Sequence, residues 1–276
     1  MTAHTMVWIH GWGTSSSIWQ SESLVSLLEK KGCTCTLITV SFAHCHTTDE
    51  MLNGIIEAFD QASLLEQPWH VMGWSLGGML AIDALTRWLA KSCAASDVSK
   101  VSMLPPASFI AVGTTACFVD EAGRTGWRPR VLERMRRKLL REPSQVILNF
   151  TELFWSEKER EAQAYMHWRS TVEEIVKHPD YSAEGLEAGL IYLMEASLHE
   201  ALADLKRIIP ILWIHGSHDA ICSIAAVEHG DAASSVNLRV IQGAGHVLFM
   251  TSRTEWDTIL LGWLMHGARG EGNVEY

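Results

Sequence analysis

The segment around Ser75 constrains the fold of this chain more than any other. The apolar run 68–72 is typical of a short buried strand, and the run 76–89 is typical of a helix. Gly73-Trp74-Ser75-Leu76-Gly77 lies between them, so Ser75 falls where a strand turns sharply into a helix. Such a turn strains its central residue, and small residues on either side let strand and helix pass close together. The pattern predicts a nucleophilic serine at the carboxyl end of a strand.

Strands and helices alternate on both sides of this turn. Strands are expected at 6–9, 35–40, 69–73, 108–113, 209–214 and 238–241, and helices at 17–31, 51–65, 76–90 and 254–265. This alternation indicates an α/β fold, a mostly parallel sheet flanked by helices. The alternation stops between about 118 and 196, where four helices are expected: 130–141, 144–155, 157–176 and 183–195. We therefore predict an α/β core, residues 1–117 plus 197–276, interrupted by a helical insert, residues 118–196.

Two residues downstream complete a catalytic pattern. A serine hydroxyl needs a general base, and that base needs an acceptor that orients it. In a sheet of this kind the acid and then the histidine follow the serine, each just after a later strand. Asp219 follows the strand 209–214, and His246 follows the strand 238–241. The carboxyl ends of parallel strands meet at one crevice. The order therefore predicts Ser75 as the nucleophile, Asp219 as the acid and His246 as the base.

Other interpretations of the acidic residues stay open. Asp219 could instead cap a helix that begins near Ile224. Asp204 and Asp231 are weaker candidates for the catalytic acid, because neither directly follows a predicted strand.

Two pairs of histidines have a spacing that a metal could use, His215 with His218 and His44 with His46. The first pair lies where a strand passes into a loop, which favours packing or hydrogen bonding. The second pair flanks Cys45 on a predicted loop and has no further ligands for zinc. We therefore expect neither a metal nor another cofactor.

A tetrahedral intermediate also needs donors for its oxyanion. The backbone N–H of Leu76, directly after the predicted nucleophile, supplies one. The second should come from the loop after the first strand, His10-Gly11-Trp12-Gly13, where the N–H of Trp12 is the natural donor. The same glycines could simply form a tight turn.

Charge is distributed unevenly along the chain. All 276 residues together carry −10, but residues 124–141 hold eight bases and one acid and carry +7, which leaves −17 for the rest. The acidic total argues against nucleic acid as a partner. A solvated helix face is the usual explanation of a charge run. A docking site for an acidic partner is the alternative, because the local charge opposes that of the whole chain.

Composition predicts an ordinary globular protein. Hydrophobic residues make up 47% and charged residues 20%, which is usual for that class. No apolar stretch approaches the roughly 18 residues needed to span a bilayer. Residues 1–10 lack the pattern of a secretory signal, and the six cysteines form no Cys-x-x-Cys pair. We expect a cytoplasmic monomer with reduced thiols and no membrane partner.

Together these motifs resemble the α/β-hydrolase family over nearly the whole chain. They are His10-Gly-Trp-Gly, Gly73-Trp-Ser-Leu-Gly-Gly78, Gly216-x-x-Asp219 and Gly245-His246. The first two are similar to those of the BioH-type pimeloyl-[acyl-carrier protein] methyl ester esterases of biotin synthesis. The stretch 115–118, which leads into a helical insert with Trp127 near its start, is also similar to that family.

The resemblance implies a four-helix cap over the active site. It also implies a serine carboxylesterase that cleaves the methyl ester of pimeloyl-[acyl-carrier protein] through an acyl-enzyme. Carried over by motif, Ser75, His246 and Asp219 would form the triad. Trp12 and Leu76 would bind the oxyanion, and Phe150 would line the acyl channel.

In this family arginines on the cap contact the acidic carrier protein. That would give the segment 124–141 a role, with Arg134, Arg137 and Arg141 as candidate docking residues. Another small-molecule hydrolase is an alternative, as is a lyase of the menaquinone pathway, which shares the G-x-S-x-G-G motif. Such a lyase should place basic residues inside its pocket rather than on an outer face. A non-catalytic binding module that kept the fold is the third alternative.

Overall fold

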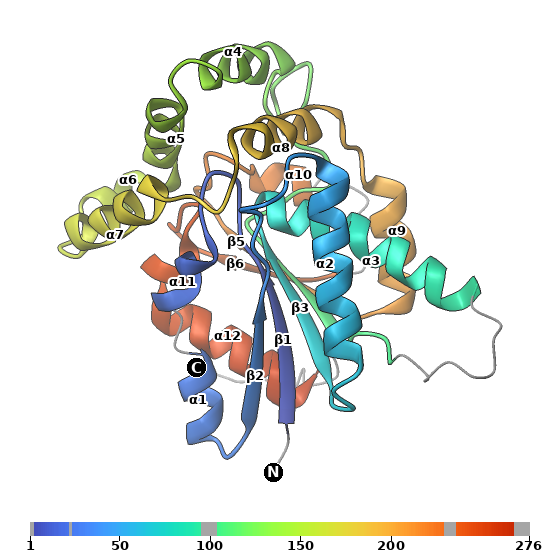
Figure 1. Ribbon diagram of the computed structural model, residues 1–276. Coiled ribbons are helices and arrows are strands. Elements are labelled where there is room, and N and C mark those ends of the chain that lie inside the picture. Colours follow the sequence, from blue (N-terminus) through green and yellow to red (C-terminus); the bar gives the residue numbers. More distant parts are fainter. Residues whose placement is uncertain (1–2, 22–23, 95–103, 229–235, 268–276) are drawn as a thin grey trace.

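The computed structural model describes residues 3–21, 24–94, 104–228 and 236–267 (Figure 1). In these residues six strands form one parallel sheet in the order β2-β1-β3-β4-β5-β6. The strands are β1 (Ala3–Ile9), β2 (Thr34–Thr39), β3 (Trp69–Trp74), β4 (Ser108–Val112), β5 (Ile211–Gly216) and β6 (Asn237–Ile241). The strand order reverses between β1 and β3, and in open α/β sheets ligands bind outside the carboxyl ends at such a point.

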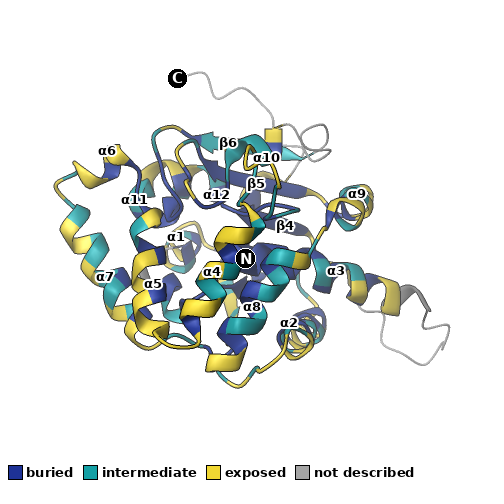
Figure 2. Cartoon of the chain, turned by 90° about the horizontal axis from the view of Figure 1, so that it is seen from above, coloured by how far each residue is buried: buried dark blue, intermediate teal, exposed yellow. Residues whose placement is uncertain are grey.

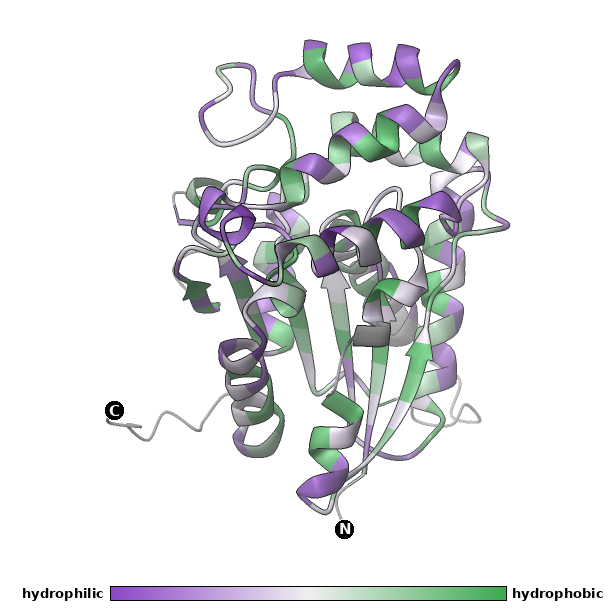
Figure 3. Ribbon diagram, turned by 90° about the vertical axis from the view of Figure 1, so that its left-hand side faces the viewer, coloured by the Kyte–Doolittle hydropathy of each residue, from purple (hydrophilic) through white to green (hydrophobic). Residues whose placement is uncertain are grey.

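Burial explains why the central strands are easy to predict. Every residue of β3, β4 and β5 is buried, as are all but the first of β1. Strands covered on both faces read as continuous apolar runs. The edge strands β2 and β6 are largely half-buried or exposed, and their sequences are more polar. The strands form the hydrophobic centre of the molecule (Figure 3).

Helices cover both faces of the sheet. Helices α1 (Leu24–Lys30) and α12 (Arg253–His266) lie on one face, and α2 (Thr48–Ser63), α3 (Leu76–Ala94) and α9 (His199–Ile208) lie on the other (Figure 1). Rings from the second group and from β3 pack together. Trp69 lies 5.5 Å from Phe59 and 5.5 Å from Trp88, measured between ring centroids. Three shorter helices complete the core: a 3-10 helix (Ser16–Ser21), α10 (Ile224–Glu228) and α11 (Leu248–Thr251).

A helical segment lies over the carboxyl edge of the sheet (Figures 1 and 2). It comprises α4 (Pro129–Leu139), α5 (Pro143–Thr151), a 3-10 turn (Glu152–Phe154), α6 (Glu157–Arg160), α7 (Tyr165–Lys177) and α8 (Ala183–Glu195). The chain leaves the core and returns to it at one place, because Cys117 and Ser197 form a β-bridge and the N–H of Leu198 donates to the carbonyl oxygen of Ala116 at 2.8 Å. Among the described residues, no helix is both long and apolar enough to cross a bilayer.

Two predicted helices differ from the described elements. Within the predicted helix 17–31 the structure describes a 3-10 helix to Ser21 and α1 from Leu24, and the predicted helix 157–176 divides into α6 and α7. Between α6 and α7 the chain turns at residues 161–164. Helices α9 and α11 were not expected. Helix α3 continues to Ala94, past the end predicted at residue 90, and Asp231, a candidate for the acid, lies outside the described residues.

Candidate active site

Ser75 occupies the turn between β3 and α3. Its φ of +57° is in the left-handed region, where a side chain is strained. The N–H of Ser75 donates to the carbonyl oxygen of Val112 in β4 at 3.0 Å. Its own carbonyl oxygen accepts a hydrogen bond from the hydroxyl of Thr114 at 2.7 Å. The residues that follow β4 therefore hold the strained turn in place. Sequence reasoning missed Thr114, although its position just after a strand was a usable signal.

The glycines around Ser75 allow a close approach of backbones. A Cβ atom at Gly73 would lie 2.6 Å from the carbonyl oxygen of Gly77. A Cβ atom at Gly77 would lie 2.5 Å from the carbonyl oxygens of both Ile9 and His10. Only glycine fits at either position, so β1 and β3 can pass directly against the start of α3 and carry the loop after β1 to Ser75.

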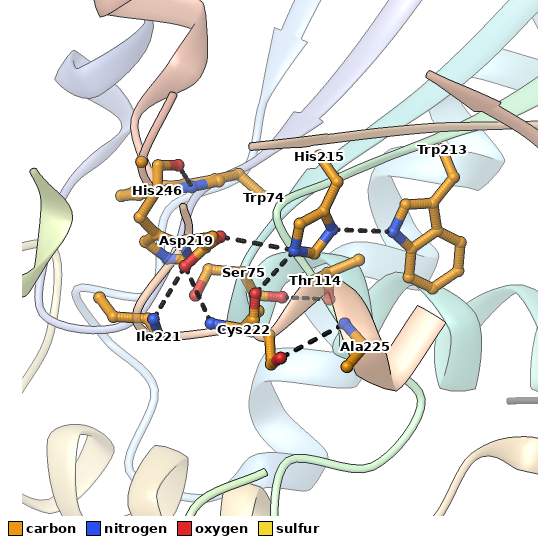
Figure 4. A network of polar contacts seen from close by, with 12 residues as sticks. Trp74, Ser75, Thr114, Trp213, His215, Asp219, Ile221, Cys222, Ala225 and His246 are labelled. Carbon is orange, nitrogen blue, oxygen red and sulfur yellow. Dashed lines mark hydrogen bonds and ion pairs between the residues drawn. The ribbon is translucent and has the colours of Figure 1, made fainter. Parts of the chain in front are cut away.

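His246 and Asp219 form a buried pair (Figure 4). Nδ1 of His246 lies 2.7 Å from Oδ2 of Asp219, and both side chains are fully buried. Burial raises the pKa of Asp219, but His246 and His215 outweigh that effect, so the pKa lies below its ordinary value. The other carboxylate oxygen, Oδ1, accepts from the N–H groups of Ile221 and Cys222 at 2.8 and 2.9 Å. The structure thus brings together the two side chains predicted as acid and base.

This pairing sets the protonation of the neutral imidazole. An ionised carboxylate only accepts hydrogen bonds, so Nδ1 of His246 carries the proton and Nε2 has the lone pair. Nε2 is buried and has no hydrogen-bond partner among the described residues. Gly113 follows Val112, whose carbonyl oxygen binds the Ser75 turn, and it lies against the pair of Asp219 and His246. A Cβ atom at Gly113 would lie 3.2 Å from Oδ2 of Asp219 and 3.4 Å from Nδ1 of His246. Figure 4 shows the side chains of Ser75, Asp219 and His246 in one region.

Two aromatic side chains position the His246 ring. Trp74 packs against it with 5.1 Å between ring centroids, and Phe154 does so at 5.5 Å. The indole N–H of Trp74 donates to the carbonyl oxygen of His246 at 3.0 Å, and the N–H of His246 donates to the carbonyl oxygen of Phe154 at 2.8 Å. The residue before Ser75 and a residue of the insert thus hold the predicted base from both sides.

A buried carboxylate of the insert binds the loop before His246. Glu159 is only 6% exposed, and its Oε1 accepts from the N–H of Gly245 at 3.0 Å and from the hydroxyl of Thr251. Its Oε2 accepts from the N–H of Ser156 at 2.8 Å, while the Ser156 hydroxyl donates to the carbonyl oxygen of Gly243 at 2.7 Å. Sequence reasoning missed both residues. Ser-x-x-Glu is a capping-box pattern, which could have indicated a helix start here.

The loop after β1 meets the insert. The indole N–H of Trp12 donates to the carbonyl oxygen of Leu186 in α8 at 2.8 Å, and its ring packs edge-on against Phe150 at 5.3 Å. Neither the backbone N–H of Trp12 nor that of Leu76 has an acceptor among the described residues; the N–H of Leu76 is the first of helix α3, which has no acceptor within the helix. The structure thus brings Phe150 to the predicted oxyanion loop.

The alternative candidates lie elsewhere. Asp204 is exposed on α9 and pairs with Arg207 at 2.9 Å. No group of three potential metal ligands occurs in the described part of the chain. The five cysteines whose side chains are described form no disulfide with one another.

The predicted docking arginines lie on the outer side of the insert. Arg134, Arg137 and Arg141 are exposed on or just after α4. They line a surface depression of about 750 Å³ together with Arg130, Lys138, Leu140 and Glu142. Arg137 pairs with Glu133 at 3.4 Å, whereas neither Arg134 nor Arg141 has an ion-pair partner among the described residues. The structure therefore separates this basic surface from the buried Ser75.

Known proteins similar to this chain agree with the fold. The chain is 27% identical over 258 residues to a pimeloyl-[acyl-carrier protein] methyl ester esterase of Pectobacterium carotovorum, covering 89% of this chain and 88% of the relative. It is 23% identical over 254 residues to the enzyme of the same name from Aliivibrio fischeri, covering 91% and 90%.

Solved structures share the architecture. An esterase from Exiguobacterium antarcticum superimposes with a TM-score of 0.72 and 17% identity, covering 96% of this chain and 92% of that one. MenH from S. aureus does so with a TM-score of 0.66 and 16% identity, covering 97% and 95%. The model of the alpha/beta hydrolase family matches residues 6–256, which include the sheet, the insert and the loops of Asp219 and His246. The chain therefore belongs to the alpha/beta hydrolase family.

Proposed function

We propose that this chain is a serine carboxylesterase with Ser75 as nucleophile, His246 as general base and Asp219 as the partner of the base. One observation carries the proposal: the buried His246 bonds through Nδ1 to an ionised carboxylate, and its Nε2 has no hydrogen-bond partner in the described part of the chain. A nitrogen in that state can accept the proton of a serine hydroxyl.

The reaction follows from these positions. Ser75 attacks the ester carbonyl carbon while Nε2 of His246 takes the hydroxyl proton. The N–H groups of Trp12 and Leu76 stabilise the resulting oxyanion. Collapse of the intermediate expels the alcohol, which receives the proton from His246, and leaves an acyl-enzyme. A water activated by His246 then releases the acid and restores Ser75.

We propose that the segment 118–196 acts as a cap and contributes the wall that contacts the acyl chain. Phe150, which is 6% exposed and packs against Trp12, is the residue best placed for that contact. Trp127, 6.1 Å away, extends the same aromatic wall. Apolar rings suit a methylene chain and not a charged group.

For the substrate, we propose the methyl ester of pimeloyl-[acyl-carrier protein], with a role in biotin synthesis. The names of the similar esterases support this choice. The basic depression on α4 supports it as well, because an acidic carrier protein would meet a cluster of exposed arginines on a chain whose net charge is −10. A cytoplasmic monomer without metal, nucleic-acid or membrane partner stays our prediction.

The arrangement of basic residues favours the esterase over a lyase acting on a compact anion. Among the described residues, every lysine and arginine is exposed or half-buried. A lyase of that kind would need a buried cation near Ser75 to bind its substrate.

The triad is tested with Ser75→Ala. We expect the rate of hydrolysis of p-nitrophenyl esters to fall about a thousand-fold or more, because the nucleophile is lost. The control is Ser170→Ala, which removes an exposed hydroxyl of α7. A Ser75→Ala variant that keeps the wild-type rate would show that Ser75 is not the nucleophile.

Substrate identity needs a separate test. We expect the wild type, but not Ser75→Ala, to restore growth without biotin to a bacterium that lacks its own esterase. If the wild type hydrolyses short p-nitrophenyl esters and still does not restore growth, the pimeloyl assignment is wrong and the esterase assignment stands.

Carrier docking is tested by charge reversal of Arg134, Arg137 and Arg141 to Glu. We expect kcat/KM for the carrier-linked ester to fall about ten-fold or more at low salt, with the free methyl ester unaffected. Reversal of three exposed lysines outside the insert is the matched control: Lys30, Lys31 and Lys91. An equal loss of kcat/KM for both esters would show that α4 does not dock the carrier protein.

A further inference from the structure

A second histidine lies behind the Asp219 carboxylate. His215, the fifth residue of β5, is fully buried within the polar network of Figure 4. Its Nδ1 lies 3.2 Å from the indole nitrogen of Trp213, two residues earlier in the same strand. Its Nε2 lies 2.7 Å from the carbonyl oxygen of Cys222. The proposed triad makes no use of this residue.

These two partners decide which nitrogen of His215 carries the proton. An indole N–H can only donate, so Nδ1 of His215 accepts and is unprotonated. A carbonyl oxygen can only accept, so Nε2 carries the hydrogen that binds Cys222. Burial lowers the pKa of His215 below its ordinary value, although Asp219 and the Cys222 carbonyl oppose that effect. The ring is therefore neutral near pH 7, with its hydrogen on Nε2.

The Nε2–H of His215 faces the loop that carries Asp219. Nε2 lies 3.7 Å from Oδ2 of Asp219, the same oxygen that accepts from His246. Cys222, whose carbonyl oxygen His215 binds, also donates its N–H to Oδ1 of Asp219 at 2.9 Å. The positive end of the N–H dipole thus lies beside the carboxylate, and the same N–H fixes a residue that orients the carboxylate.

We propose that His215, held in its Nε2–H form by Trp213, is a positioning residue that orients Asp219 toward His246. In the opposite tautomer the lone pair of Nε2 would face both the Cys222 carbonyl and the Asp219 carboxylate and would repel them. Trp213 therefore acts on the acid through His215. The kinetic consequence rests on the proposed esterase function, whereas the tautomer does not.

The tautomer is tested by 15N NMR of the wild-type chain. The two ring nitrogens of His215 should give the shifts of an unprotonated Nδ1 and a protonated Nε2. In Trp213→Phe, which removes the indole donor, the population with a proton on Nδ1 should rise. A wild-type ring protonated on Nδ1 would overturn the proposal.

The positioning role is tested by kinetics with a p-nitrophenyl ester. We expect Trp213→Phe and His215→Phe each to lower kcat about ten-fold, the scale of one buried hydrogen bond, with KM within about two-fold of wild type. Because Trp213 acts through His215, the double variant should be no slower than His215→Phe alone. Losses that multiply in the double variant would contradict the proposal.

A matched control separates the loss of the hydrogen bond from the loss of a buried indole. Trp8 of β1 is 1% exposed, and its indole N–H has no hydrogen-bond partner among the described residues. Trp8→Phe should lower Tm as Trp213→Phe does but keep the wild-type kcat. If Trp8→Phe slows the enzyme equally, the effect of Trp213 is one of packing and the proposal is wrong.

The remaining outcomes distinguish failure of the positioning role of His215 from failure of the proposed esterase function. If the wild type neither hydrolyses esters nor reacts with a fluorophosphonate at Ser75, the esterase proposal fails, and the NMR result still tests the tautomer. If the wild type is active and the variants of Trp213 and His215 keep its kcat, only the positioning role fails. Should His215→Phe not fold, His215→Gln takes its place. Its amide can donate to Cys222 and accept from Trp213, so it should retain more activity than Trp213→Phe.

Discussion

The loops that carry Asp219 and His246 differ in how far they depend on the insert. The Asp219 carboxylate is oriented from the core, through His215 of β5 and the N–H groups of residues 221 and 222, and the insert adds one hydrogen bond to this loop, from the indole of Trp127 to the carbonyl oxygen of Ile221. The His246 loop is held from both sides, by the indole of Trp74 in β3 and, from the insert, by the carbonyl oxygen of Phe154 and the side chain of Glu159. The predicted acid is therefore oriented mainly by the core, whereas the predicted base depends on the insert as well.

This difference has a consequence for the insert. A helical segment that only covered the site could move without disturbing the triad. Here the segment 154–159 supplies hydrogen bonds to Gly243, Gly245 and His246. Displacement of the segment should therefore disturb the base while leaving the acid in place.

The substitution Gly245→Ala should break this arrangement most severely. A Cβ atom at this position would lie 2.7 Å from Oε2 of Glu159 and against the carbonyl oxygen of Phe154, so the loop and the insert would have to separate. We expect kcat to fall about 100-fold or more, since misplacement of a catalytic group by about 1 Å has an effect of that size. Steady-state kinetics with a p-nitrophenyl ester measures the loss.

Gly262→Ala is the control for that substitution. A Cβ at Gly262, in α12, would meet nothing within 4 Å. Alanine favours a helix over glycine by about 1 kcal/mol, so Tm should stay or rise and kcat should be unchanged. If Gly245→Ala behaves like this control, the insert does not hold the base.

The substitution Glu159→Gln tests the same contact without adding volume. The amide keeps one acceptor oxygen but places an NH2 group against the N–H of either Gly245 or Ser156. A buried donor left unsatisfied costs about 1 to 3 kcal/mol, so we expect a lower Tm and a fall in kcat of about thirty-fold with little change in KM. Glu157→Gln, on the exposed side of α6, is the matched control. Equal kinetics for the two variants would show that the carboxylate is not needed.

The contrast between the loops also explains what the sequence could predict. The central strands are buried on both faces, so they appear as apolar runs, and Ser75 and Asp219, the predicted nucleophile and acid, each follow such a run. Ser75, Asp219 and the loop of Trp12 could be placed from that pattern alone. The hydrogen bonds by which the core orients the Asp219 carboxylate join residues that are close in sequence, from Trp213 to Cys222.

The fixation of the base could not be predicted in that way. Glu159 and Gly245 are 86 residues apart, and no local pattern relates a helix start to a distant loop. Helix α9 was not predicted for another reason: only Leu202 and Leu205 of its residues are buried, so its apolar periodicity is too short to indicate a helix.

Mild acid should destabilise the α/β core more than the insert. The core buries histidines that stay neutral: burial lowers the pKa of His70 to about 3 and that of His10 to about 4. Both histidines of the insert, His167 and His178, are exposed. The unfolded chain binds a proton at each buried histidine below a pH of about 6.5, whereas the folded chain does not. Stability is therefore complete above that pH and falls as the pH decreases.

The substitution His70→Gln measures the contribution of His70 to this pH dependence of stability. The ring of His70 bonds to the hydroxyl of Ser108 at 2.8 Å and to His4 at 3.2 Å, so glutamine can keep part of the hydrogen bonding without titrating. Each buried histidine contributes up to about 1.4 kcal/mol per pH unit. Between pH 7.5 and 5.5 the free energy of unfolding should therefore fall by about 1.4 kcal/mol less in His70→Gln than in wild type. Urea unfolding at both pH values measures this, with His178→Gln as the control that should follow the wild type. Identical slopes in all three proteins would mean that the core histidines do not set the acid limit of stability.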